Sequence, residues 1–206
     1  MKDVSPPNWN ENIRFDYPLH AHSIVIDAGM YEGTWSEQMV RRFNCRIIGL
    51  EPVKAYYQAC VARFRGNDRV QVLNTGLGAE AGWNVLHVNG DATSRYRQTG
   101  VPEICAFRPL ASLLTSQKLD SVSLLKLNIE GSEYLVLENA VQTRLLERIE
   151  FVQVQFHDGP EYSPQRLLSI REQLEITHTC EWRWGPMTWE SWRRRPKSNS
   201  RPGFID

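Results

Sequence analysis

Short apolar runs alternate along this chain with segments whose apolar residues recur at helical spacing. Trp35, Met39 and Phe43 stand four residues apart, which is the spacing of an amphipathic helix. Apolar runs predict strands at 23–29, 45–52, 69–78, 121–131 and 149–159, and helical patterns predict helices at 33–43, 53–64, 132–140 and 163–174. Because strands and helices alternate over short connections, we expect a mostly parallel sheet with helices on both faces.

Two further apolar segments follow the last predicted helix. Residues 177–184 and 187–195 alternate in the manner of strands and flank a Gly-Pro pair typical of a turn. They predict a C-terminal antiparallel hairpin that completes a seven-stranded sheet. The fold class is therefore α/β and Rossmann-like, an arrangement in which ligands bind beyond the carboxyl ends of the parallel strands.

The alternation of strand-like and helical patterns also indicates the domain boundaries. Residues 1–20 carry Pro, Asn and aromatic residues without a period and predict an irregular lead-in, whereas residues 21–195 form a single domain. Within it, residues 81–110 lose the helical period, begin with a strand-like alternation and continue as a polar loop. We expect this region to be an insertion that affects specificity. Residues 196–206 are polar and predict a disordered tail.

Composition limits the partners of the protein. Acidic and basic residues balance at 24 each among 206 residues, so no global field attracts nucleic acid or an anionic membrane. No apolar window approaches the length of a bilayer, and the N-terminus lacks the apolar core of a secretory signal. The four cysteines are widely spaced, unlike a zinc site or a disulfide scaffold. We expect a soluble cytoplasmic protein without a nucleic-acid partner or a membrane span; the sequence does not indicate its oligomeric state.

The turn after the first predicted strand, within IVIDAGMYEGTW, carries the first candidate binding residues. Asp27, Gly29 and Gly33 lie between the end of this strand and the start of the next helix. Glycines there let the backbone come close to a ligand, and a helix N-terminus offers unpaired N–H groups. A nucleotide-like ligand fits this turn, although a glycine after a strand is also ordinary turn chemistry.

Glu51 ends the second predicted strand. A carboxylate at this point of a doubly wound fold accepts both ribose hydroxyls of a bound nucleoside, which includes a nicotinamide cofactor. A dinucleotide fingerprint is G-x-G-x-x-G, but here Asp27 stands where its first glycine would be. Because a carboxylate there repels a pyrophosphate, the pattern favours S-adenosylmethionine, which has a cationic sulfonium and no phosphate.

The chain resembles the FkbM-type methyltransferases, a branch of the S-adenosylmethionine-dependent class I fold. The resemblance rests on IVIDAGMYEGTWS, GLEPV, NTGLGAEAG, LLKLNIEGSEYLVLENA and VQVQFHD, and runs from Tyr17 to Trp192. It implies a single-domain class I methyltransferase fold with S-adenosylmethionine as the cofactor. It also implies that the methyl acceptor is a hydroxyl of a small molecule or a saccharide.

The resemblance also assigns residues to the cofactor pocket. They are Asp27, Gly29 and Gly33 at the methionine end, Glu51 at the ribose, and Gly76, Leu77 and Gly78 at the adenine. The family pattern K-x-[DN]-x-E-G-x-E most often has aspartate where this chain has Asn128. This departure matters because an asparagine cannot act as a base or as a strong metal ligand.

Methyl transfer from a sulfonium is a one-step displacement, so the enzyme aligns the reactants and accepts a proton when the acceptor is a hydroxyl. The sequence predicts Asn128, Glu130 and His157 as catalytic residues. His157 is the best base because its ordinary pKa lies near neutrality, and Asp158 or Glu130 can orient its ring. The alternatives are a histidine that bonds a loop backbone, and a Glu130 and Glu133 that only cap the next helix.

A divalent metal held by Glu130, Glu133 and His157 is a further alternative. We expect no metal, because no short-spaced ligand motif supports one and Asn128 removes the most obvious carboxylate. Lys126 points to the same face as Asn128 and is expected to pair with a neighbouring acid.

Three other features offer groups to an acceptor. The polar loop DATSRYR places Asp91, Thr93, Ser94 and Arg95 where they either contact the acceptor or are only solvated. Four tryptophans of the last hairpin either stack on an acceptor ring or, as we expect, pack into the core: Trp182, Trp184, Trp189 and Trp192. The basic residues from Arg193 onward predict a solvated end.

Three rival functions fit parts of the pattern: a nicotinamide-dependent oxidoreductase, a non-catalytic cofactor-binding module, and a nucleic-acid methyltransferase. Asp27 and the K-x-N-x-E-G motif count against the first. The chain lacks the basic composition and the N/D-P-P-[YF] motif that favour the third. Only an assay for turnover separates the second from an enzyme.

Overall fold

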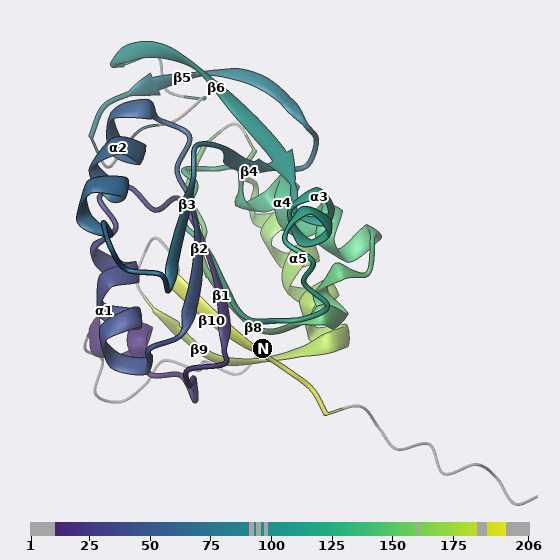
Figure 1. Ribbon diagram of the computed structural model, residues 1–206. Coiled ribbons are helices and arrows are strands. Elements are labelled where there is room, and N and C mark those ends of the chain that lie inside the picture. The colour runs from purple at the N-terminus through teal and green to yellow at the C-terminus, as the bar shows by residue number, and fades with distance from the viewer. Residues whose placement is uncertain are drawn as a thin grey trace, which may run out of the picture.

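The centre of the protein is a seven-stranded sheet with strand order β3-β2-β1-β7-β8-β10-β9 (Figure 1). Its strands are β1 (Ile24–Ala28), β2 (Arg46–Leu50), β3 (Val70–Leu73), β7 (Val122–Leu127), β8 (Ile149–Gln155), β9 (His178–Trp184) and β10 (Trp189–Arg194). Neighbouring strands run parallel except at β10, which is antiparallel to both β8 and β9. The predicted α/β fold, with a mostly parallel sheet and a C-terminal antiparallel hairpin, is confirmed.

The computed structural model describes residues 11–90, 93, 96, 99–159, 161–184 and 189–196. Residues 1–10 of the predicted lead-in and residues 197–206 of the predicted tail lie outside the described residues, as do Asp91, Ser94 and Arg95 of the polar loop. In the described part of the chain, no helix has both the length and the apolar character needed to cross a bilayer.

Helices cover both faces of the sheet, as the sequence predicts (Figure 1). One face carries α1 (Thr34–Phe43) and α2 (Lys54–Arg63), and the other carries α3 (Leu110–Ser116), α4 (Glu133–Gln142) and α5 (Pro164–Thr177). The described residues also form two short 3-10 helices, Glu11–Phe15 and Leu145–Arg148. The first of them lies within the lead-in that the sequence predicts to be irregular, and residues 16–20, which follow it, have no regular secondary structure.

Consecutive residues of the central strands supply two separate cores. Val25 and Leu124 are buried among the residues of α1, such as Met39, whereas Ile26 and Leu125 are buried against α3, α4 and α5. Successive side chains of a strand point to opposite faces, so a strand buried on both faces has an unbroken apolar sequence. This is why the central strands were visible in the sequence as apolar runs.

A second sheet of three strands departs from the sequence prediction. It contains β4 (Gly76–Gly78), β5 (Gly82–Val88) and β6 (Val101–Pro109) in the order β4-β6-β5. The segment 69–78, predicted as one strand, therefore belongs to two sheets. The chain leaves the main sheet at Asn74, whose side-chain amide donates to the backbone oxygens of Glu51 and Pro52, both at 3.0 Å.

Two stretches of the predicted insertion, Gly82–Val88 and Val101–Pro109, thus form strands. The strand expected near its start is confirmed as β5, but β6 and the following α3 were not predicted. Pro102 and Pro109 interrupt the sequence of β6, and a proline weakens a strand pattern because it donates no ladder hydrogen bond. This second sheet lies above the carboxyl edge of the main sheet, against the start of α2 (Figure 1).

The C-terminal hairpin packs its tryptophans as the sequence predicts. Trp182, Trp189 and Trp192 are buried, whereas Trp184 is exposed. Beneath them the buried Glu190 accepts from Trp192 Nε1 at 2.9 Å and pairs with Arg171 of α5. The hairpin is therefore part of the core, and three of its four tryptophans are not offered to an acceptor.

Candidate active site

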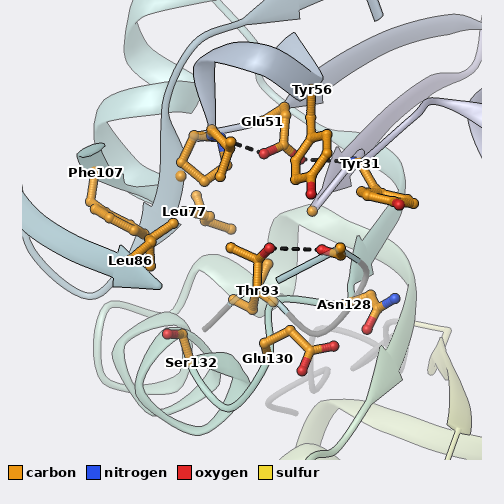
Figure 2. Close-up of a pocket in the computed structure, with 16 residues that line it drawn as sticks. Tyr31, Glu51, Tyr56, Leu77, Leu86, Thr93, Phe107, Asn128, Glu130 and Ser132 are labelled. Carbon is orange, nitrogen blue, oxygen red and sulfur yellow. Dashed lines mark hydrogen bonds between the residues drawn. The ribbon is translucent and has the colours of Figure 1, made fainter. Parts of the chain in front are cut away.

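A pocket opens at the carboxyl ends of β1, β2 and β7 and is roofed by the second sheet (Figure 2). The empty space within it is about 740 Å³, including its open mouth. The residues that line it are Gly29, Tyr31, Glu51, Pro52, Val53, Tyr56, Gly76, Leu77, Leu86, Gly90, Thr93, Phe107, Asn128, Ile129, Glu130 and Ser132. The site lies where a doubly wound sheet places its ligands.

The backbone of Gly29 forms part of the floor. A Cβ at this position would lie 1.9 Å from the backbone oxygen of Asn128, and the φ angle is +79°. Only glycine accepts both the left-handed conformation and this close approach. Gly29 thereby joins the end of β1 to the end of β7 and keeps the floor of the pocket open.

Glu51 is held at the pocket by two backbone donors. Its Oε2 accepts the N–H of Tyr31 at 2.8 Å, and its Oε1 accepts the N–H of Val53 at 2.9 Å. Burial raises the pKa of the Glu51 carboxyl to about 7, although these two hydrogen bonds favour the ionised form. The carboxylate is therefore oriented before any ligand arrives and titrates near neutrality.

An apolar slot lies beside Glu51. Leu77, Leu86 and the ring of Phe107 lie together on one side of the pocket (Figure 2). A Cβ on Gly76 would lie 2.3 Å from Phe107 Cε1, so glycine is needed for this ring to lie against β4. A flat apolar group with a polar edge, such as a purine base, fits this slot.

Two aromatic residues flank Glu51 on its other side. The rings of Tyr31 and Tyr56 meet edge to face with their centroids 4.7 Å apart. Tyr31 has a φ of 52°, a conformation that is rare and costly for a bulky side chain. In this conformation the N–H of Tyr31 donates to Glu51.

Asp27 does not line the pocket. It is fully buried, and its Oδ1 lies 2.7 Å from Lys126 Nζ while its Oδ2 accepts from Ser36 Oγ at 2.6 Å. Lys126 also donates to the backbone oxygen of Gly29 at 2.9 Å. The pairing predicted for Lys126 is confirmed. Asp27 shapes the floor only indirectly, and its charge is compensated, so the repulsion of a pyrophosphate inferred from the sequence loses its basis.

Asn128 and Glu130 form the wall opposite Glu51 (Figure 2). The side-chain oxygen of Asn128 is buried and accepts no hydrogen bond from the residues that the structure describes. Such an atom normally has a partner, because leaving a buried acceptor unpaired costs about 1–3 kcal/mol. The Asn128 oxygen is thus suited to receive an N–H or O–H of a ligand.

His157 lies behind this wall and does not line the pocket. Its ring nitrogens are 3.1 Å from a Glu130 oxygen and 3.0 Å from a Glu133 oxygen. Burial opposes the charged ring, but the hydrogen bonds and charges of the two carboxylates outweigh it and raise the pKa to about 10. Glu130 is one of the two orienting acids that the sequence suggested, whereas Asp158 is exposed and the second partner is Glu133.

The same three residues do not converge on one point, as metal ligands would. Each nitrogen of His157 faces a different carboxylate, and the carboxylate of Glu133 also accepts two backbone N–H groups. Among the described residues, no group of three or more His, Cys, Asp or Glu is placed to hold a metal ion.

The structure brings together most of the predicted site residues, but not all. Gly29, Glu51, Gly76, Leu77, Asn128, Glu130 and Thr93 line the pocket. Gly33 begins α1 and packs against Phe64, and Gly78 borders a neighbouring hollow beneath the second sheet.

The sequence did not point to Tyr31, Tyr56 or Phe107 as site residues. Tyr56 and Phe107 are far from the glycine turn in sequence, and Phe107 belongs to the strand that was not predicted. The available signal for Tyr31 was its position between two glycines of the turn. A bulky residue is unusual there, because left-handed turn positions usually take glycine or asparagine.

The chain matches the model of one protein family and resembles many solved structures in fold. The methyltransferase FkbM domain matches residues 27–178. No curated protein matches the chain.

Solved structures with a similar fold include the following three. A putative rRNA methylase from Clostridium thermocellum is 11% identical, with a TM-score of 0.53 over 86% of this chain and 89% of that chain. The Methanococcus jannaschii fibrillarin pre-rRNA processing protein is 7% identical, with a TM-score of 0.55 over 88% and 70% of the chains. TrmK of M. capricolum, in complex with S-adenosylhomocysteine, is 6% identical, with a TM-score of 0.51 over 86% and 65%. At these identities the likeness shows the fold alone.

Proposed function

Because the chain belongs to the methyltransferase FkbM domain family, we propose that it transfers a methyl group from S-adenosylmethionine to a hydroxyl of a small molecule or a saccharide. S-adenosylmethionine is the cofactor. When bound, it supplies an electrophilic methyl group whose leaving group is a neutral thioether. The protein must hold the cofactor, place the acceptor oxygen in line with the methyl group, and accept a proton.

The single observation that carries this proposal is the juxtaposition of Glu51 with an apolar slot at the carboxyl ends of the strands. The oriented carboxylate of Glu51 matches the two hydroxyls of a ribose, and the slot between Leu77 and Phe107 matches the adenine. The unpaired oxygen of Asn128, beside the backbone of Gly29, matches the ammonium group at the methionine end. The residues present therefore fit the cofactor.

The charge of the pocket supports an acceptor that is not an anion. Glu51 and Glu130 are both in its wall, and no Lys, Arg or His is among the described residues that line it. A phosphorylated acceptor would be repelled by the two carboxylates. Thr93, Asn128 and Glu130 supply the hydroxyl, amide and carboxylate groups that bind the hydroxyls of a neutral ligand. We infer from this that nucleic acid is not the acceptor.

The state of the cysteines supports a reducing compartment, and we place the protein in the cytoplasm. All four are free, and Cys45, Cys60 and Cys105 are buried. Burial raises the pKa of each of these three thiols, which keeps them protonated and unreactive.

A methyl-transfer assay tests the proposed function. The protein is incubated with S-adenosylmethionine that carries a radiolabelled methyl group and with a panel of phenols, monosaccharides, disaccharides and total RNA. Label is expected on a hydroxyl of a phenol or sugar and should disappear in Glu51→Ala. Glu172→Ala, an exposed acid on α5, serves as the matched control and should keep full activity. Label on RNA alone would contradict the proposed acceptor.

A further inference from the structure

His157 lies between two carboxylates from neighbouring segments. Its Nε2 is 3.1 Å from Oε1 of Glu130, and its Nδ1 is 3.0 Å from Oε1 of Glu133. The His157 side chain is 3% exposed. A neutral imidazole has a single N–H, so its second nitrogen would turn a lone pair towards a carboxylate oxygen. Only the doubly protonated ring donates to both carboxylates.

Glu133 fixes this arrangement to the backbone. Its Oε1 accepts the N–H of Ile129 at 2.7 Å, and its Oε2 accepts the N–H of Gly131 at 2.8 Å. Glu133 is also the first residue of α4, where the helix N-terminus favours a negative charge. Since the Glu133 carboxylate is held by two backbone donors, it holds the ring of His157 in turn.

Glu130 is the member of this cluster that reaches the pocket. It lines the wall beside Asn128, and its side chain is 17% exposed (Figure 2). Its φ of 54° lies in the left-handed region, which is unfavourable for a residue with a Cβ. Strain of this kind persists where the surroundings impose it, and it gathers at functional sites. The turn thus presents Glu130 to the cavity at a cost in stability.

We propose that His157 is a positioning residue, an imidazolium that fixes the Glu130 carboxylate at the pocket wall, and that Glu130 is the catalytic residue that receives the proton of the acceptor hydroxyl. The inference rests on the proposed function, because it requires a hydroxyl acceptor in the pocket. It replaces the role of base that the sequence predicts for His157. A cation between Glu130 and Glu133 is also needed for stability, since two nearby carboxylates removed from water repel each other.

The proton transfer balances without a further reactant. As the acceptor oxygen takes the methyl group, the bond between the methyl carbon and the sulfonium sulfur would break and leave its electron pair on a neutral thioether. The O–H bond of the acceptor breaks at the same time, and the proton passes to an oxygen of Glu130. His157 keeps both of its protons throughout. Glu130 returns its proton to water when the methylated product leaves, because its side chain is partly exposed at the pocket.

The two roles of His157 predict opposite dependences on pH. A histidine base must be neutral to work, so the rate would rise with pH through the pKa of the ring. A positioning imidazolium works only while charged. The groups that face its ring are Glu130 from the turn and Glu133 from α4, and they keep it charged at neutral pH. The rate should therefore be level around neutrality and fall as the pH approaches about 10.

Heteronuclear NMR of the imidazole nitrogens tests the inference without any acceptor. At about pH 7.5 the His157 ring, identified by its absence in His157→Gln, should show two protonated nitrogens. His178 is the internal control: it is equally buried, its Nε2 bonds the backbone oxygen of Ile149, and burial lowers its pKa to about 4, so it should be neutral. A His157 ring in one neutral tautomer would overturn the proposal.

Variants separate the positioning role from a merely structural one. On the best hydroxyl acceptor of the panel, Glu130→Gln should lose about a hundredfold or more in kcat with little change in KM. His157→Gln should lose kcat by a smaller factor and abolish the fall in rate near pH 10. S-adenosylhomocysteine should bind both variants as it binds the wild type, which shows that the pocket is folded. If Glu130→Gln keeps wild-type kcat, the proposal fails even though the protein is a methyltransferase; if the wild type does not bind S-adenosylhomocysteine, the proposed function itself fails.

Discussion

The backbone of Gly29 touches the backbone of Asn128 so closely that a Cβ on Gly29 would lie 1.9 Å from the Asn128 oxygen. This contact joins β1 to β7 at the floor of the pocket. The backbone cannot move away without separating the ends of the two strands, because the N–H of Asn128 also donates to the oxygen of Ala28 at 3.1 Å. The sequence alone is compatible with Gly29 being only a turn residue, but the close packing of β1 against β7 requires a glycine at this position.

Gly29→Ala is expected to destabilise the protein more than Gly66→Ala. Both glycines have nearly the same φ, +79° and +78°, but nothing lies within 4 Å of a Cβ on Gly66. Gly66→Ala should cost about 1 kcal/mol through backbone strain alone. Gly29→Ala should cost a further 1–3 kcal/mol or so, because the clash forces the strands apart. Urea unfolding of both variants measures the difference, and equal losses would contradict the contact.

The titration of Glu51 predicts how cofactor affinity depends on pH. Its pKa in the free protein is raised to about 7, and the ribose hydroxyls bind the ionised form. The affinity for S-adenosylhomocysteine should therefore increase by roughly tenfold between about pH 6 and pH 8, as the carboxylate ionises. Glu51→Gln should bind weakly at every pH and show no such slope. A wild-type affinity that falls over this range would argue against a role for Glu51 in binding.

The charged ring of His157 predicts a pH dependence of stability. Its folded pKa, about 10, lies above the ordinary value of 6.5, so the folded state binds the proton more tightly than the unfolded state. The stabilisation is fully present below about pH 6.5 and is lost as the pH rises towards 10. Unfolding free energies of the wild type and His157→Gln should differ most at the acid end of this window and converge at its alkaline end. If the difference in unfolding free energy between the wild type and His157→Gln grew with pH, it would contradict a raised pKa of His157 in the folded protein.

Strain at Tyr31 can be measured by comparing two small residues. Tyr31→Gly and Tyr31→Ala both remove the ring that meets Tyr56, but only alanine keeps the unfavourable left-handed conformation. The glycine variant should be more stable than the alanine variant by about 1 kcal/mol. Thermal unfolding gives the difference. An alanine variant of equal or greater stability would show that the turn at Tyr31 is unstrained in solution.

The sequence predicted the main sheet because its signals are local. The central strands are buried on both faces, so β1, β2, β7 and β8 stand out as apolar runs. The turn between β1 and α1 could be located from Gly29 and Gly33, and the strand-end carboxylate from Glu51. Each of these features depends on a few consecutive residues, which is what pattern analysis can detect.

The second sheet, and the buried residues behind the pocket wall, depend on contacts between residues far apart in the sequence. A local pattern cannot predict such contacts. Gly76 and Phe107 meet across two strands, and Phe107 follows a proline-interrupted segment. Nothing near Asp27 in sequence shows that Lys126, 99 residues away, neutralises its charge. The contact between His157 and Glu133 was missed for the same reason, because the two residues are 24 positions apart in the sequence.

Calorimetric titration of the purified protein with S-adenosylhomocysteine tests the central claim most directly. The account predicts saturable binding at one site per chain, lost or weakened at least tenfold in Glu51→Ala, because hydrogen bonds to a charged group contribute about 1.5–3 kcal/mol each. It also predicts no binding of the oxidised or reduced nicotinamide dinucleotides. Tight binding of a nicotinamide dinucleotide, with no heat from S-adenosylhomocysteine, would contradict it.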